Sequence, residues 1–225
     1  MKAAAFLAAV KGQLIVSCQA LEDEPLHGAQ IMAQMAVAAK TGGAAAIRAN
    51  GPADIRAIKR AVDLPVIGLY KQGDSGVYIT PTFAAAAEIA AAGADVIALD
   101  CTQRPRPDGL PLADLLARIH RDLKLPTFAD VAALPEARFA AAAGAAMAAP
   151  TLSGYTDARP PLEGPDFELL AQMIDHLPIP VIAEGRVNTP EQARRALDLG
   201  AWAVVVGSAI TRPRSITARF ARALQ

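Results

Sequence analysis

The chain of 225 residues has few aromatic side chains, two cysteines and no excess of charge of either sign. Aromatic residues make up 4%, too few for the stacking surfaces on which single-stranded nucleic acids bind. The formal net charge is zero, so no overall field attracts nucleic acid or an anionic membrane surface. Any anionic ligand must therefore be held by local groups, and we expect neither a nucleic-acid nor a membrane partner.

Disulfides, membrane spans and metal motifs are also missing. Cys18 and Cys101 are too few for a disulfide framework, and we expect free thiols in a reducing, cytoplasmic compartment. No apolar run is long enough to span a bilayer. The apolar residues 1–10 are followed almost at once by a strand pattern, which predicts a short helix closing the bottom of the fold rather than a secretory signal. The histidines lack the spacing of metal ligands, so no metal site is predicted.

What the chain does have is a repeated pattern of short apolar segments of strand length. They cover residues 14–18, 45–49, 65–70, 95–99, 127–131, 145–150, 180–183 and 203–207. Amphipathic patterns and terminal glycines predict helices between them, so each repeat fits one strand and one helix. We therefore predict an α/β fold, a single (β/α)8 TIM barrel of the phosphate-binding type that covers residues 1–225 as one domain. The alternative, an open doubly wound sheet, usually has a glycine fingerprint after its first strand, and residues 18–27 contain no glycine.

Two charged residues stand where the third and seventh predicted strands end. In such barrels the carboxyl ends of the strands form the active site, and a charge there is costly unless it is paired or used. These strands are four apart in an eight-stranded ring, so we predict that Lys71 and Glu184 face each other across its mouth. Opposed acid and base groups suit removal of a proton from one face of a carbon and its return to the other. The alternatives are a solvated loop position for Lys71 and a structural ion pair of Glu184 with Arg186 or Arg212.

Further polar residues end other strands of the predicted ring. Gln19, Arg48 and Asp130 follow or close the first, second and fifth strands, and we predict that they bind substrate together with Arg212. A surface or packing role is the alternative for each of the first three.

The last two strands end in glycines, which lets backbone N–H groups come close to an anion. We predict a phosphate site there, formed by Gly185, Arg186, Gly207 and Ser208. The pattern indicates the class of ligand rather than the individual substrate.

Seven sequence blocks together resemble one known family over nearly the whole chain. They cover residues 15–28, 47–51, 77–82, 104–109, 151–156, 181–186 and 204–213. The family is that of the N-acetylmannosamine-6-phosphate 2-epimerases. The resemblance implies a TIM barrel that inverts C2 of N-acetylmannosamine 6-phosphate to give N-acetylglucosamine 6-phosphate in sialic acid breakdown. It also implies a homodimer without a redox cofactor. By position, the family's catalytic lysine and glutamate correspond to Lys71 and Glu184.

The same resemblance implies that the family's substrate-contacting glutamine, arginines and aspartate correspond to Gln19, Arg48, Arg212 and Asp130. Three other functions remain open at this point. The first is a non-catalytic barrel that senses a sugar phosphate. The second is another phosphate-binding barrel enzyme, such as an aldolase or a pentose-phosphate epimerase. The third is an acid/base pair formed by Cys18 and Cys101.

Overall fold

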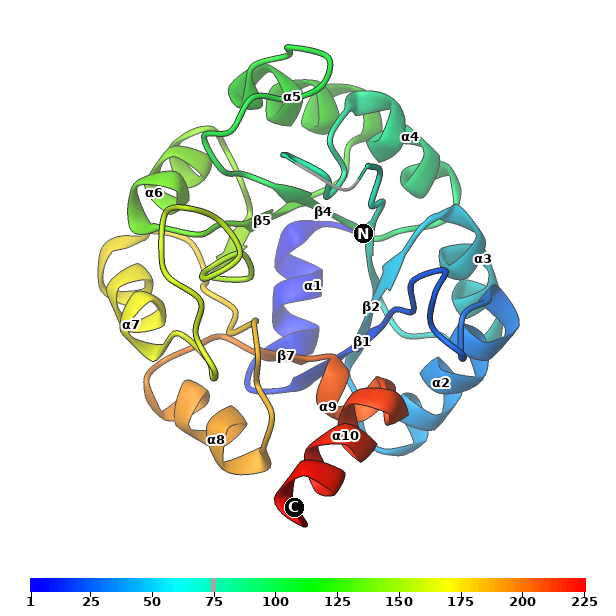
Figure 1. The fold of residues 1–225 in the computed structure, drawn as a ribbon. Coiled ribbons are helices and arrows are strands. Elements are labelled where there is room, and N and C mark those ends of the chain that lie inside the picture. Colours follow the sequence, from blue (N-terminus) through cyan, green and yellow to red (C-terminus); the bar gives the residue numbers. More distant parts are fainter. Residues whose placement is uncertain (74–75) are drawn as a thin grey trace.

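Seven parallel strands form a curved sheet that closes into a barrel (Figure 1). The structure, a computed structural model, describes residues 1–73 and 76–225. Hydrogen bonding orders the strands β6-β5-β4-β3-β2-β1-β7. They are β1 (Leu14–Cys18), β2 (Ala46–Asn50), β3 (Val66–Leu69), β4 (Val96–Asp100), β5 (Thr127–Asp130), β6 (Met147–Ala149) and β7 (Val204–Val206). The predicted (β/α)8 barrel is thus confirmed.

The eighth member of the ring is a bridging segment rather than a full strand. Val181 pairs with Ala148 of β6, and Ala183 pairs with Val204 of β7, both in parallel. This pairing amounts to one bridge on either side, although β6 and β7 each pair with their other neighbour over three residues. The prediction of a continuous strand over 180–183 is therefore wrong, but the segment does lie between its predicted neighbours and closes the ring.

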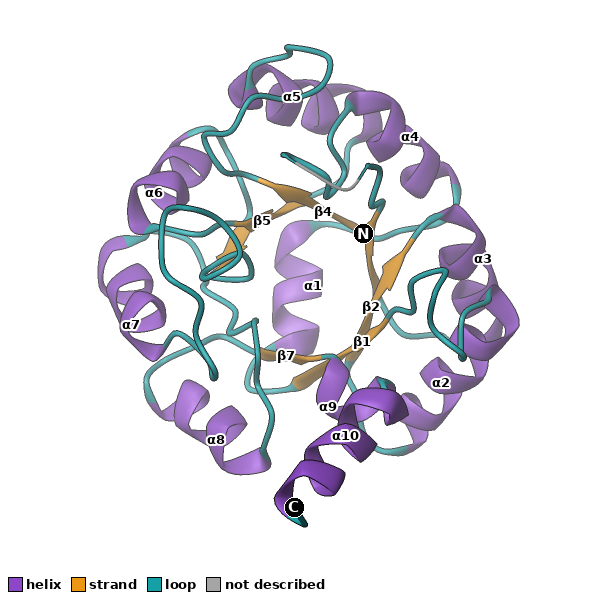
Figure 2. Ribbon diagram, viewed as in Figure 1, coloured by secondary structure: helices purple, strands orange, loops and turns teal. Residues whose placement is uncertain are grey.

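Helices surround the ring, as Figure 2 shows, except α1, which lies inside it. They are α1 (Ala3–Val10), α2 (Ala29–Thr41), α3 (Pro52–Ala61), α4 (Phe83–Ala91), α5 (Leu112–Arg118), α6 (Leu134–Ala142), α7 (Phe167–His176), α8 (Pro190–Asp198), α9 (Ser208–Thr211) and α10 (Pro213–Ala223), with a π-helical turn η1 (Ile119–Leu123) after α5. The side chains of Thr82, Asp166 and Thr189 cap α4, α7 and α8 by accepting hydrogen bonds from backbone N–H groups. Within the described residues, no helix has both the length and the apolar character that crossing a membrane requires.

Helix α1 fills the amino-terminal end of the barrel, as predicted. Figure 1 shows it inside the ring of strands. Phe6 and Val10 are completely buried in a cluster with inward-facing strand residues such as Ile15. The indole nitrogen of Trp202 fixes the helix further by donating a hydrogen bond to the carbonyl oxygen of Leu7 (2.8 Å).

Alternation along the strands explains why the opposite end is polar. Ile15, Ala46, Leu69, Phe128 and Ile182 all lie in the inner apolar cluster. Successive side chains of a strand point to opposite faces, so the residue two positions later also points inward, nearer the carboxyl end. Those residues are Ser17, Arg48, Lys71, Asp130 and Glu184. Polar side chains, four of the five charged, therefore form the layer directly above the apolar interior.

Candidate active site

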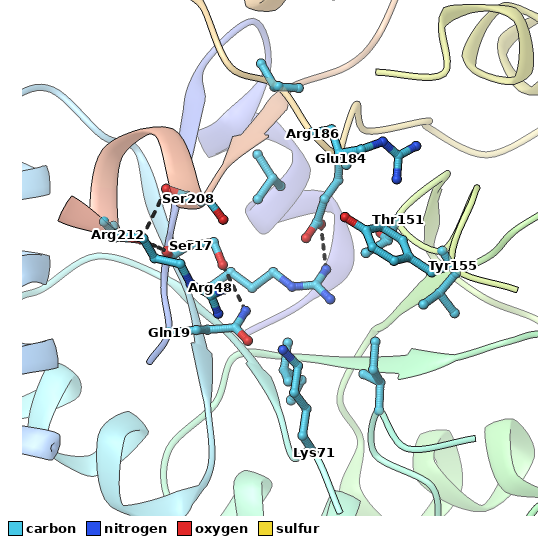
Figure 3. A pocket seen from close by; sticks show the side chains of 18 of the residues that line it. Ser17, Gln19, Arg48, Lys71, Thr151, Tyr155, Glu184, Arg186, Ser208 and Arg212 are labelled. Atoms are coloured by element: carbon cyan, nitrogen blue, oxygen red, sulfur yellow. Dashed lines mark hydrogen bonds and ion pairs between the residues drawn. The ribbon is translucent and has the colours of Figure 1, made fainter. Parts of the chain in front are cut away.

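A cavity of about 440 Å³ opens at the carboxyl ends of the strands (Figure 3). Its walls come from the ends of β1, β2 and β3, the loops after β3 and β6, and the segments that follow residues 183 and 206. Among its lining residues are Ser17, Gln19, Arg48, Lys71, Thr151, Glu184, Gly185, Arg186, Gly207, Ser208 and Arg212. Most of the residues predicted to carry function are thus brought to one place.

Arg48 is the fixed cation at the floor of this cavity. Its side chain is 1% exposed and donates hydrogen bonds from Nη1 to Asp130 Oδ1 (3.0 Å) and Glu184 Oε2 (2.6 Å), and from Nη2 to Asp130 Oδ2 (2.6 Å). Burial alone would lower the pKa of Arg48, but the Asp130 and Glu184 carboxylates outweigh it and hold the pKa above its usual value. The guanidinium therefore stays charged and rigidly oriented.

Glu184 follows the bridging segment 181–183 and has an unusual titration. Burial raises the pKa of Glu184 to about 7, and the Asp130 carboxylate adds to the rise. The Arg48 guanidinium and the Lys71 amine oppose it. Both the protonated and the ionised forms of this carboxyl are consequently populated near neutral pH, which suits a group that gives and takes protons.

Lys71 lies one residue beyond the third strand of the ring. Its backbone N–H donates to Asn50 Oδ1 (2.8 Å), and it forms an antiparallel bridge with Ile79, so its backbone is held on two sides. Burial lowers the pKa of Lys71 to about 8, with Arg48 and Arg212 adding to the fall and Glu184 opposing it. About one amine in ten is then neutral at pH 7, against about one in a few thousand for an ordinary lysine.

The two titrating side chains approach the same point. Figure 3 shows Lys71 and Glu184 directed into the cavity from opposite sides, with the guanidinium of Arg48 between them. An amine and a carboxyl whose pKa values have moved towards each other can exchange proton roles with a bound molecule at neutral pH.

The residues predicted to hold an anion lie at the ends of the last two ring members. Gly185 has a φ of 110°, a conformation that side-chain-bearing residues rarely adopt, and it leads the chain around the rim. Gly207 and Ser208 begin α9, so their backbone N–H groups lie at the start of that short helix. Arg212 lies in the break between α9 and α10, where its Nη1 is 3.4 Å from Glu24 Oε1. The Arg212 guanidinium and the backbone N–H groups of Gly207 and Ser208 thus lie on the same wall of the cavity.

Two predicted binding residues are placed differently from expectation. Asp130 lies behind Arg48, is completely buried, and also accepts a hydrogen bond from Thr151 Oγ1 (2.6 Å), so it holds other side chains rather than forming the cavity wall. The Arg186 guanidinium lies 4.9 Å from the centre of the Tyr155 ring, and its Nε donates to the Gly164 carbonyl oxygen (2.9 Å). It is therefore turned away from Ser208 and Arg212 (Figure 3).

Gln19 and Arg48 each leave one polar atom unpaired in the cavity floor. Gln19 Nε2 donates to Ser17 Oγ (2.8 Å), whereas Gln19 Oε1 and Arg48 Nε are buried and have no hydrogen-bond partner among the described residues. Such atoms are rare in folded proteins because an unmade buried hydrogen bond is costly. Within the described residues, one acceptor and one donor beside the cavity are thus left without a hydrogen-bond partner.

Some cavity residues were missed by sequence reasoning. Tyr78 and Tyr155 line the cavity from the loops after β3 and β6, and Thr151 hydrogen-bonds Asp130. The available signal was the scarcity of aromatic residues combined with the position of these tyrosines in the motif blocks 77–82 and 151–156. Thr151 opens the motif block 151–156, but no role for it follows from the sequence.

The cysteine pair is not part of this site. Cys18 and Cys101 are free and belong to the apolar layer between strands and helices. Burial raises the pKa of the Cys18 thiol to about 12 and that of Cys101 well above its usual value, which removes the thiolate needed for acid/base work. Within residues 1–73 and 76–225, histidine, cysteine and carboxylate side chains nowhere gather in a group of three that could hold a metal ion.

Comparison with known proteins identifies relatives along the whole chain. Residues 32–225 match the family model described as "Putative N-acetylmannosamine-6-phosphate epimerase". A protein of Cutibacterium acnes named "Putative N-acetylmannosamine-6-phosphate 2-epimerase" is 51% identical over 221 residues, which cover 97% of this chain and 96% of the relative. A protein of Listeria monocytogenes with the same name is 46% identical over 96% of this chain and 93% of its own length.

Solved structures show the same relationship. The structure of the N-acetylmannosamine-6-phosphate 2-epimerase from Clostridium perfringens superposes with a TM-score of 0.93 at 49% identity, covering 96% of this chain and 95% of that one. Thiamine phosphate pyrophosphorylase from Pyrococcus furiosus, with a TM-score of 0.59 and 21% identity over 95% of this chain and 98% of its own, shares the fold alone. The chain belongs to the N-acetylmannosamine-6-phosphate epimerase family.

Proposed function

We propose that this protein inverts C2 of N-acetylmannosamine 6-phosphate to give N-acetylglucosamine 6-phosphate, with residues 1–225 working as one barrel domain. One observation carries the proposal beyond family membership. A lysine with a pKa of about 8 and a glutamate with a pKa of about 7 point into one cavity, with a fixed arginine between them. This is the equipment that proton transfer at a carbon acid requires near neutral pH.

The phosphate anchors the substrate in the proposed complex. Backbone N–H groups at Gly185, Gly207 and Ser208 surround the phosphate oxygens, and the Arg212 guanidinium adds a charge-assisted hydrogen bond. Glu24 lies beside Arg212 and holds its guanidinium at this wall. The binding energy gained at the phosphate then holds the reacting carbon, at the other end of the sugar, in position for proton transfer.

The chemistry begins with opening of the sugar ring, which produces an aldehyde at C1 and makes the C2 proton acidic. The neutral amine of Lys71 takes that proton, and the electron pair of the C2–H bond moves through C1 onto the aldehyde oxygen. A proton returned to the opposite face of C2 restores the aldehyde with inverted configuration. Glu184 in its protonated form supplies that proton or assists ring opening. No electron enters or leaves the substrate, so the route needs no redox cofactor.

Arg48 and Gln19 stabilise the intermediate in this scheme. The negative charge that develops on the C1 oxygen lies next to a guanidinium that burial and Asp130 have already oriented, so little reorganisation is needed during reaction. The unpaired Gln19 Oε1 is free to accept a hydrogen bond from a substrate hydroxyl or amide. Asp130 acts through Arg48 and Thr151 rather than by touching substrate.

Proton NMR in deuterated water tests the function. Incubation of N-acetylmannosamine 6-phosphate with the protein is expected to produce N-acetylglucosamine 6-phosphate that carries deuterium at C2. Inversion without deuterium at C2 would exclude proton transfer with solvent-exchangeable groups. Tight binding with no inversion would instead identify a sugar-phosphate sensor, and cleavage of a carbon–carbon bond would identify an aldolase.

We also propose that the protein is a cytoplasmic homodimer. None of the residues of α10 is buried, and Phe220 and Leu224 are 71% and 88% exposed. Figure 1 shows α10 projecting away from the barrel. A mainly apolar groove of about 410 Å³ lies between α8, α9 and the start of β1, lined by residues such as Leu14, Leu197 and Ile210. A second copy of the chain would cover both surfaces, so sedimentation at micromolar concentration is expected to give a dimer mass; a monomer would contradict this.

A further inference from the structure

Two of the three tyrosines of this chain line the cavity, and they come from separate loops. Tyr78 lies in the segment 78–79, which pairs with the segment 71–72 that holds Lys71. Lys71 forms a bridge with Ile79, and the N–H of Gln72 donates to the carbonyl oxygen of Tyr78 (2.9 Å). Tyr155 lies in the loop between β6 and α7. In a chain with 4% aromatic residues, this convergence on one cavity calls for a function.

Tyr155 is held in place although it is 59% exposed. Its N–H donates to the carbonyl oxygen of Leu152 (3.0 Å), and the Arg186 guanidinium covers its ring at 4.9 Å. The Arg186 side chain is itself fixed by its hydrogen bond to Gly164. Figure 3 shows the Tyr155 side chain directed into the cavity beneath Arg186. An exposed aromatic ring that the protein orients towards a cavity is suited to contact a ligand.

The position of Tyr155 relative to the anion site determines which part of the substrate it would meet. Ser208 and Arg212 lie on one side of Lys71 and Glu184, and Tyr155 lies on the other (Figure 3). A sugar phosphate anchored by its phosphate and reacting at C2 extends from the first side towards the second. The substituent carried by C2, an N-acyl group, is then the part of the substrate nearest to the tyrosines.

The two tyrosines offer what a short amide substituent needs. Aromatic faces provide apolar contact for the acyl carbon chain, and phenol hydroxyls can donate to the amide oxygen or accept from the amide N–H. Burial raises the pKa of Tyr78, and the Asp130 and Asp100 carboxylates and Tyr155 raise it further against the opposing charge of Arg104. Its hydroxyl therefore remains a donor at neutral pH. Leu152, which is 2% exposed, adds an apolar wall.

We propose that Tyr78 and Tyr155 form the subsite for the N-acyl group and determine which acyl groups the enzyme accepts. This inference rests on the function proposed above. Tyr155 limits the length of the acyl chain by closing the subsite with its ring, whereas Tyr78 contributes a hydrogen bond to the amide. Arg186 is a positioning residue that keeps the Tyr155 ring over the cavity.

The test compares N-acetyl-, N-propanoyl- and N-butanoylmannosamine 6-phosphate in binding by calorimetry and in kcat/KM. Tyr155→Ala is expected to raise the ratio of butanoyl to acetyl affinity by about tenfold, as expected when a wall that rejects extra methylene groups is removed. Tyr78→Phe keeps the ring, and its affinity for all three sugars is expected to fall by about three- to tenfold, the effect of one lost hydrogen bond, with the ratio unchanged. Tyr70→Phe is the matched control, because Tyr70 packs against the outer core and its substitution is expected to change neither value.

The outcomes separate this inference from the proposed function. Binding ratios do not require turnover, so a shifted ratio without deuterium exchange would overturn the proposed function alone. If Tyr155→Ala changes the affinity for all three sugars by one common factor, the acyl subsite is overturned while the epimerase function stands. Because Tyr155 is largely exposed, loss of folding is not expected, and circular dichroism of the variant checks this.

Discussion

The two ends of this barrel are built on the same strands and yet have opposite chemistry. At the amino end the inward-facing residues are apolar, and Phe6 and Val10 of α1 fill the space between them. At the carboxyl end the next inward positions are Arg48, Lys71 and Glu184. A shift of two residues along a strand therefore separates a layer that stabilises the fold from the layer to which we assign the proposed chemistry.

The difference is also energetic. Burial of Phe6 is favourable, whereas the lowered pKa of Lys71 and the raised pKa of Glu184 mean that folding disfavours the charged forms of both groups. For Lys71 this loss of folding free energy is complete below pH 8. It disappears as the pH rises from about 8 to the pKa that the amine has in the unfolded chain. For Glu184 the loss of folding free energy is absent at acid pH. It grows as the pH rises from the pKa that the carboxyl has in the unfolded chain to about 7. The active end is thus maintained at the expense of stability.

The largest expected effect comes from removing the amine. Lys71→Met keeps the length and the apolar contacts of the side chain but has no proton-transfer group, so we expect kcat/KM to fall by at least about 1,000-fold. At pH 7 the free energy of unfolding is expected to rise by about 1–2 kcal/mol, because the cost of burying a charged amine is gone. Urea titration and the epimerase assay measure both quantities on one preparation. Activity within tenfold of wild type would show that Lys71 is not the proton-transfer residue.

The anion side of the cavity is expected to give the second largest effect. Arg212→Ala removes one charge-assisted contact to the phosphate, and KM is expected to rise by about 10- to 100-fold with a smaller change in kcat. Arg138→Ala on the exposed side of α6 is the control, since it removes an arginine far from the cavity. Equal KM values for the two variants would contradict a phosphate site at Arg212.

The pH dependence sharpens the comparison further. Below about pH 7 Lys71 is protonated and cannot accept a proton, and above about pH 8 Glu184 is ionised and cannot donate one. We expect kcat/KM to be greatest between these values and to fall about tenfold per pH unit on either side. A profile that is flat from pH 6 to 9 would rule out this pair as the titrating groups.

The smallest expected effect on turnover comes from the apolar end. Phe6→Ala leaves a cavity beneath the inner layer, which is expected to lower the free energy of unfolding by about 3–5 kcal/mol. The kcat/KM of the folded protein is expected to stay within about twofold of wild type, because the polar layer lies beyond it. Denaturant unfolding and the assay at low temperature test this together. A large loss of kcat/KM at unchanged fold content would show that the two ends are coupled.

Sequence reasoning predicted the ring and most of its rim because both depend on local patterns. Apolar segments located the strands to within one or two residues, and glycines and proline placed most helix boundaries. The family was also predicted correctly from the motif blocks. The full strand at 180–183 failed because the segment forms only one bridge to each neighbour, at Val181 and at Ala183.

The rest of the site depends on contacts that no local pattern determines. Asp130 lies behind Arg48 because both of its carboxylate oxygens accept hydrogen bonds from the Arg48 guanidinium, and the Arg186 side chain turns to Tyr155 because the loop after β6 brings that ring to it. Neither loop path follows from residue spacing. The roles proposed for Tyr78 and Tyr155 likewise depend on two separate loops that place both side chains at one cavity.

The ionisation of Lys71 in the free protein tests the account most directly. NMR titration of the 15N-labelled lysine side chains, with the Lys71→Met spectrum for assignment, gives its pKa. We predict a value of about 8, set by burial together with Arg48 and Arg212. A value near 10.4, that of an ordinary exposed lysine, would contradict the claim that the carboxyl end of this barrel prepares a neutral amine for proton transfer.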